Sequence, residues 1–181
     1  MGGGNLLHNK KHISAFLIII FLCLAITPGI RAGGATNFKL TSIDNKKYQL
    51  KDVLGKQVVL VSFWALWCKP CRKELGEIEK IYQDYKEKPV AVWSINIDTA
   101  SFKSKVKSYV KSLNLEVPIL LDPASQAVKL YNPRVIMPYT FIIDLNGDIA
   151  FTHTGYNDGD ELVLRQKIDE YLKAGETKES E

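Results

Sequence analysis

The chain has 181 residues, of which 46% are apolar and 24% charged, and its net charge is +4 at pH 7. This length favours one domain, and the composition excludes a disordered chain, a collagen-like repeat and a disulfide-dense miniature protein. Three of the basic residues and none of the acidic ones lie in positions 1–34, so the remainder is nearly neutral and gives no reason to expect a nucleic-acid partner.

Residues 1–34 have the pattern of an export signal. Lys10 and Lys11 precede an apolar stretch over 15–26, and small residues follow it. This order is typical of a cleaved signal peptide. The apolar stretch is shorter than the about 20 residues of a spanning helix, but its apolar flanks leave a retained membrane anchor open. Cys23 follows a leucine rather than a small residue, so a lipoprotein signal is not expected. Either outcome places the folded part outside the cytoplasmic membrane, where disulfides persist.

The first half of the remaining chain alternates expected strands with an expected helix. Short strand-like segments at 38–40 and 48–50 flank turn residues and indicate a β-hairpin. The apolar runs at 57–64 and 90–97 are typical of strands buried on both faces. Apolar residues at three- and four-residue spacing predict a helix over 71–86.

The second half continues the alternation and ends in a hairpin and a helix. The patterns predict an amphipathic helix at 101–113, a strand at 119–121, a short helix at 125–131, a hairpin of strands 140–143 and 149–154, and a helix at 161–172. This order implies one α/β domain over residues 35–174, with a mostly parallel central sheet to which the late hairpin adds antiparallel strands. Residues 175–181 are expected to form a polar tail that is frayed.

The chemistry-bearing motif is Trp67-Cys68-Lys69-Pro70-Cys71, which follows a buried strand and begins a helix. The free N–H groups and the positive dipole end of a helix N-terminus stabilise a thiolate. Cys68 is expected to carry the more exposed sulfur, and Cys71 lies one turn further along, close enough to form a disulfide. Pro70 suits the first turn, where its missing N–H costs nothing, and Lys69 adds a positive charge beside Cys68.

This motif predicts thiol–disulfide exchange. The Cys68 thiolate attacks a substrate disulfide, and Cys71 resolves the mixed disulfide; in reverse the pair is an oxidant. Half of a zinc site is an alternative, but zinc takes four ligands. Beyond residue 34 the chain has only these two cysteines and one histidine, His153. An inert structural disulfide is the other alternative.

Three segments resemble a known family. The run Trp64-Ala65-Leu66-Trp67-Cys68-Lys69-Pro70-Cys71-Arg72-Lys73-Glu74 resembles the W-A-x-W-C-x-P-C-R-x-E signature of the TlpA/ResA/CcmG-like branch of the thioredoxin superfamily, whose fold is related to that of AhpC/TSA proteins. Residues 50–56 resemble the family's L-x-D-x-x-G-K stretch, and residues 138–144 resemble its P-x-T-F-x-I-D stretch. The resemblance covers about residues 36–172 and implies a thioredoxin-like α/β fold, in which helices flank a central mixed sheet with an N-terminal β-hairpin extension.

The resemblance also implies a cis peptide bond between Met137 and Pro138 that packs against the active-site disulfide. Such a bond leaves the Met137 N–H and C=O free to pair with an extended substrate. An ordinary trans proline at the start of a strand is the alternative. Trp64 is expected in the core, and Trp67 beside the exposed sulfur as part of a docking surface.

The proton acceptor for Cys71 stays open at this point. Thioredoxins proper carry a buried aspartate where this chain has Ser62. Asp98, just after the second central strand, is one candidate, with an ordinary loop acid or helix cap as its alternative. Glu74 faces the same side of the helix as Cys71 and is the other candidate, with structural pairing to a lysine as its alternative. His153, without a partner histidine, is interpreted as structural or exposed.

These patterns together predict a thiol–disulfide oxidoreductase in the periplasm or another extracytoplasmic compartment, secreted or anchored to the cytoplasmic membrane. Its redox group is the Cys68–Cys71 disulfide, and neither another cofactor nor a metal is expected. The resemblance implies a reductant of exported proteins, possible roles in cytochrome c or other metalloprotein maturation, and a membrane electron donor.

Three other functions stay open. The first is a disulfide-donating oxidant of the same fold. A peroxiredoxin-like peroxidase is less favoured, because Ala65 stands where the threonine of a T-x-x-C motif is needed. A copper-binding chaperone is less favoured as well, because such relatives use a C-x-x-x-C spacing and a distant histidine, for which His153 is the only candidate.

Overall fold

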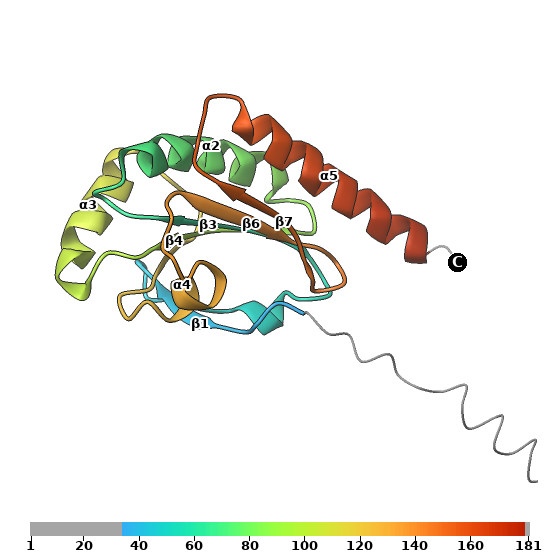
Figure 1. Ribbon diagram of the computed structural model, residues 1–181, viewed down its shortest axis with the longest axis horizontal. Helices are drawn as coiled ribbons and strands as arrows, with labels where there is room; N and C mark the ends of the chain where they lie inside the picture. Colours follow the sequence, from blue (N-terminus) through green and yellow to red (C-terminus); the bar gives the residue numbers. More distant parts are fainter. Residues whose placement is uncertain (1–33, 180–181) are drawn as a thin grey trace, which may run out of the picture. The chain divides into compact units, whose positions relative to one another are not determined.

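The computed structural model describes residues 34–179, so the expected signal or anchor over 1–34 lies outside the described residues except for Gly34. Seven strands form one sheet, and helices cover both of its faces (Figure 1). The strands are β1 (Lys39–Ser42), β2 (Lys47–Gln49), β3 (Val58–Trp64), β4 (Val90–Asn96), β5 (Ile119–Leu121), β6 (Tyr139–Ile143) and β7 (Ile149–Thr154). The helices are α2 (Lys69–Tyr85), α3 (Lys103–Ser112), α4 (Gln126–Tyr131) and α5 (Asp160–Glu179), with short 3-10 helices η1 (Leu50–Asp52) and η2 (Ala100–Phe102).

The strand order is β2-β1-β5-β4-β3-β6-β7. The sheet is mixed, as predicted, but it is not mostly parallel: β3, β4 and β5 are parallel to one another, and every other pairing is antiparallel. The first hairpin also joins the sheet, through an antiparallel pairing of β1 with β5 that was not predicted. A hairpin needs no crossover helix, so the alternation of strands and helices does not reveal how it attaches.

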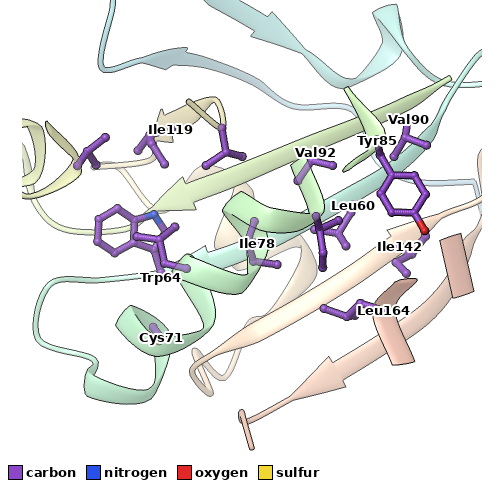
Figure 2. Packing of buried hydrophobic residues seen from close by; sticks show 14 of the residues in the cluster. Leu60, Trp64, Cys71, Ile78, Tyr85, Val90, Val92, Ile119, Ile142 and Leu164 are labelled. Carbon is purple, nitrogen blue, oxygen red and sulfur yellow. The ribbon is translucent and has the colours of Figure 1, made fainter. Parts of the chain in front are cut away.

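Alternating residues of the central strands separate two apolar clusters, one on each face of the sheet. One cluster packs β3, β4 and β6 against α2, α3 and α5, and Figure 2 shows Trp64, Ile78, Ile142 and Leu164 within it, with Cys71 at the beginning of α2. The other cluster packs the opposite face against the N-terminal hairpin and α4, and it is rich in aromatic rings. The active-site helix therefore lies on one face of the sheet only.

The C-terminal helix differs most from the sequence expectation. α5 continues past Leu172 to Glu179, so the expected frayed tail is largely helical. A Cβ at Gly175 would lie 2.1 Å from Leu145 Cδ1, so glycine allows the helix to pass close to the β6–β7 turn. Glycine is unfavourable in an isolated helix, which explains why the pattern predicted an end before it. Among residues 34–179, no helix is both long and apolar enough to cross a membrane.

Candidate active site

The two cysteines lie where the loop after β3 enters α2. They form a disulfide with an S–S distance of 1.97 Å and a Cα–Cα distance of 5.3 Å. Cys68 is the N-cap residue, and its Sγ accepts a hydrogen bond of 3.3 Å from the Cys71 backbone N–H. Cys68 is 5% exposed and Cys71 is fully buried, so the order of exposure is as predicted. Of the two cysteines, Cys68 is therefore the more accessible to a substrate.

The residues between and around the cysteines lie as the sequence indicated. Lys69 and Pro70 are exposed and occupy the first turn of α2. Trp67 is 65% exposed, and Trp64 is fully buried on the α2 face of the sheet. Trp67 thus provides an apolar surface directly before the reachable sulfur.

Asp98 holds the loop that carries the cysteines. It is 8% exposed, and its Oδ2 accepts hydrogen bonds from the Leu66 N–H at 2.8 Å and from the Asn96 side-chain amide at 2.9 Å. The Arg72 guanidinium donates a hydrogen bond to the backbone carbonyl of the same residue, Leu66. Asp98 is therefore buried, but its contacts favour a structural role in fixing the loop.

The peptide bond between Met137 and Pro138 is cis, as the resemblance implied. β6 begins one residue later and pairs with β3 so that Tyr139 lies opposite Phe63, which places Pro138 at the sheet edge where the cysteine loop starts. Asn132 fixes the approach to this bond: its amide donates to the Ile136 carbonyl at 2.8 Å, and its Oδ1 accepts from the Ile136 N–H at 3.1 Å. Within residues 34–179, no hydrogen bond to the Met137 N–H or C=O is present.

The Glu74 side chain, which belongs to α2, is buried between this helix and the sheet, with 1% of its surface exposed. The Ser62 hydroxyl donates to its Oε2 and the Thr140 hydroxyl donates to its Oε1, both at 2.9 Å. Ser62 and Thr140 are direct partners across β3 and β6, so the two hydroxyls stand side by side under one carboxyl group. The alternative of a structural pairing with a lysine is wrong, because both carboxyl oxygens accept hydrogen bonds from the sheet instead.

Burial raises the pKa of Glu74 from 4.5 to about 7, although the hydrogen bonds from Thr140 and Ser62 and the charge of His153 act to lower it. A carboxyl group with a pKa near neutrality can both accept and release a proton under ordinary conditions. Thioredoxins proper carry a buried aspartate on the strand itself, at the position that Ser62 occupies here. In this chain the carboxyl group comes from α2 instead and accepts a hydrogen bond from Ser62.

The partners of Glu74 and of the cis peptide bond, Thr140 and Asn132, do not follow from the sequence patterns. The same is true of the partner of His153. His153 Nε2 lies 2.9 Å from Asp160 Oδ2. A usable signal existed for Thr140, because a lone polar residue interrupts an apolar strand there as Ser62 does in β3. In the part of the chain that the structure describes, no group of three or more His, Cys, Asp or Glu side chains is arranged to hold a metal ion.

Comparisons with known proteins show the family to which the chain belongs. The AhpC/TSA family model matches residues 33–152. The thiol–disulfide oxidoreductase ResA of Bacillus thuringiensis subsp. konkukian is 34% identical over 139 residues, which are 77% of this chain and 75% of ResA.

Two solved structures have the same fold. A Chlorobium tepidum protein assigned as the thiol:disulfide interchange protein DsbE has a TM-score of 0.69 and 30% identity, over 77% of this chain and 96% of its own. The exposed lipoprotein thioredoxin Etrx1 of Streptococcus pneumoniae has a TM-score of 0.62 and 26% identity, over 75% and 99%. The chain therefore belongs to the AhpC/TSA family, and within it to the thiol–disulfide oxidoreductases that include ResA.

Proposed function

We propose that this oxidoreductase reduces disulfides in exported proteins and that Glu74 accepts the proton of Cys71 during the reaction. The observation that carries the proposal is the position of the Cys68–Cys71 disulfide at the start of α2, with the buried Glu74 carboxyl one turn further on. The reachable sulfur, the buried sulfur and a titratable carboxyl thus follow one another along one helix.

The reductive cycle starts from the dithiol. The Cys68 thiolate attacks one sulfur of the substrate disulfide, which breaks, and the leaving thiolate takes up a proton from solvent. The Cys71 thiol gives its proton to the Glu74 carboxylate and attacks Cys68 Sγ. The Cys68–Cys71 bond forms as the mixed-disulfide bond breaks, and the second substrate sulfur leaves as a thiolate that takes up a proton from Glu74 or solvent. Two electrons have then passed to the substrate. An electron donor outside this chain then restores the dithiol.

Three exposed apolar residues form the substrate side of the site in this proposal. Trp67 precedes Cys68, and Val135 and Ile136 precede the cis peptide bond at the same sheet edge. The N–H and C=O of Met137, which follows Ile136, have no hydrogen-bond partner among the described residues and offer hydrogen bonds to an extended peptide. An unfolded segment that contains a cystine and apolar side chains fits such a surface.

The extracytoplasmic location rests on the basic and apolar pattern of residues 1–34 and on the likeness to an exposed lipoprotein thioredoxin. A periplasmic or membrane-anchored protein of this kind needs a membrane electron donor, because the cytoplasmic thiol systems are out of reach. Apocytochrome c and other metalloprotein precursors are the substrates that the resemblance to ResA-like proteins favours.

The test compares two variants of the full chain. Cys68→Ser is expected to abolish reduction of a protein disulfide, whereas Cys71→Ser is expected to accumulate mixed disulfides that mass spectrometry can identify. Full activity of Cys68→Ser would refute the proposed chemistry. The reduction potential of the wild-type couple gives the direction: a value near −270 mV supports a reductant, and a value near −120 mV would instead indicate a disulfide donor.

A further inference from the structure

A cavity opens at the edge of the sheet where the parallel strands end. It has a volume of about 320 Å³, within the range of ligand sites, and it lies between the end of β4, the strand β1 and the first residues of α3 and α4. Asn96, the last residue of β4, lines it and pairs with Leu121 on β5 and with Trp64 on β3, directly before the cysteine loop. Ligands of open α/β sheets commonly bind outside the carboxyl ends of parallel strands. A ligand in this cavity would therefore lie at the same sheet edge as the disulfide.

Two buried side chains that line the cavity keep unused hydrogen-bonding capacity. Asn96 is 1% exposed and Asp98 is 8% exposed. The Asn96 amide donates to Asp98 Oδ2 at 2.9 Å, and its Oδ1 accepts from the Asp98 N–H at 3.1 Å. The second N–H of the Asn96 amide and the Oδ1 atom of Asp98 have no hydrogen-bond partner among residues 34–179. Because buried polar groups are normally paired, this free donor and this free acceptor favour a ligand that supplies both partners.

Two lysines give the cavity its charge. Lys39 on β1 and Lys103 at the start of α3 both line it, and both are exposed. Neither forms a salt bridge within the described residues, and the Lys103 ammonium donates only to the neutral side chain of Asn45, at 3.4 Å. The one carboxylate in the lining, that of Asp98, is engaged through Oδ2. The two cations therefore favour an anionic group at the cavity.

We propose that this cavity binds an acidic segment of the substrate polypeptide. Lys39 and Lys103 pair with the carboxylate of the segment. The N–H and C=O of one extended residue point to the same side of a chain, so one residue of the segment can donate to Asp98 Oδ1 and accept from the Asn96 amide. This inference rests on the proposed function, and it adds a substrate feature outside the cystine itself.

The cavity is connected to the redox site through Asp98. Its Oδ2 accepts from the Leu66 N–H at 2.8 Å, two residues before Cys68, whereas its Oδ1 is left for the ligand. Leu40 and Leu121 provide apolar lining, which suits an aliphatic side chain next to the acidic residue. An extended polypeptide that presents its disulfide to Cys68 lies at this same sheet edge. This continuity favours a segment of the substrate over an unrelated small molecule.

The direct test titrates the full chain, with its disulfide closed, with the capped peptide acetyl-Ala-Leu-Glu-Ala-amide and follows the Asn96 side-chain amide by NMR. A saturable shift is expected, and the Gln version of the peptide should bind about fivefold more weakly because it lacks the charge. The double variant Lys39→Gln/Lys103→Gln should abolish the difference between the two peptides. Lys107→Gln/Lys111→Gln, which removes two exposed cations of α3 outside the cavity, is the matched control and should retain it.

Three results would overturn the inference. The first is equal binding of the Glu and Gln peptides by the wild type, and the second is an equal loss in the control double variant. The third is saturation by sodium butyrate at the same concentration as by the Glu peptide, because this would indicate a site for free carboxylic acids. The peptides contain no cysteine and the disulfide stays closed, so none of these results depends on the redox reaction.

A kinetic measurement connects the cavity with the proposed function. The reduced full chain is given peptide disulfides in which a Leu-Glu or a Leu-Gln pair stands two, four or six residues from the cystine. At one of these spacings the Glu peptide is expected to show a kcat/KM about fivefold higher, and Lys39→Gln/Lys103→Gln should abolish this advantage. If no spacing gives an advantage, the cavity does not serve the substrate and the inference fails. If Cys68 reduces none of the peptides, the proposed function fails, whereas the NMR titration still decides whether the cavity binds an acidic peptide.

Discussion

The two faces of the central sheet differ in a way that separates stability from chemistry. On the face covered by α4 and the N-terminal hairpin, Phe63 and Phe141 lie in an aromatic cluster, in which the rings of Phe141 and Tyr131 stack at 4.4 Å. On the face covered by α2, their chain neighbours Ser62 and Thr140 hold a buried carboxyl group. A step of one residue along β3 or β6 thus leads from the aromatic cluster to the residues that hold the buried carboxyl group, because successive side chains point to opposite faces.

This difference predicts that the aromatic face can be weakened without a change in the chemistry. Phe141→Ala removes a fully buried ring, and we expect it to lower the free energy of unfolding by about 3–5 kcal/mol in urea titrations. In the fraction that stays folded, the Glu74 titration midpoint should not change. Phe141→Leu, which retains most of the apolar volume, is the control with a smaller loss. A Glu74 midpoint that moves in Phe141→Ala would show that the two faces are not independent.

The carboxyl on the other face should make stability depend on pH. The Glu74 pKa is about 7 in the folded chain and 4.5 as a free group, so the folded state holds an extra proton between these values. The free energy of unfolding should therefore fall, by about 3 kcal/mol, as the pH rises through this window, and Glu74→Gln should remove that fall. Urea titrations of both oxidised proteins at pH 5 and pH 8 measure the difference, and an identical pH dependence would contradict the assignment.

The two hydroxyls under Glu74 should have smaller effects of a defined sign. Each donates a hydrogen bond to the carboxylate, so Ser62→Ala or Thr140→Val should raise the Glu74 midpoint by roughly one pH unit. NMR titration of the carboxyl carbon gives the shift. A downward shift would mean that the hydroxyls favour the protonated acid.

The smallest effect is expected for a substitution of Ser94 on β4, the strand beside β3. Ser94 pairs with Ser62, but its buried Oγ has no hydrogen-bond partner among the described residues. Ser94→Ala should therefore leave the Glu74 midpoint unchanged and the free energy of unfolding within about 0.5 kcal/mol of the wild type, or slightly higher. A midpoint shift as large as that of Ser62→Ala would instead place Ser94 in the hydrogen-bonded network.

Local patterns predicted the parts of the site that are close together in the chain. The cysteines and Pro70 follow one another at the start of a helix, and their placement follows from the strand before it and the helix after it. The cis bond before Pro138 came from a resemblance, since no physical signal in the sequence distinguishes it from a trans proline.

The environment of Glu74 could not be predicted in the same way. Its bond to Thr140 joins residues 66 positions apart and depends on the register between β3 and β6, which the sequence leaves open. The pairing of His153 with Asp160 depends in turn on how the chain leaves β7 and enters α5. The chemistry of the motif was therefore predictable, but the groups that tune it were not.

The most direct test of the account is the reduction potential of the Cys68–Cys71 couple as a function of pH, in the wild type and in Glu74→Gln. The slope of this curve reports how many protons accompany the two electrons. If Glu74 exchanges a proton with Cys71, its affinity for protons differs between the disulfide and dithiol forms. The wild-type curve should therefore carry a change of slope near pH 7 that the Glu74→Gln curve lacks, whereas changes caused by ionisation of the thiols themselves are common to both. Parallel curves throughout this range would contradict the coupling between the carboxyl group and the disulfide.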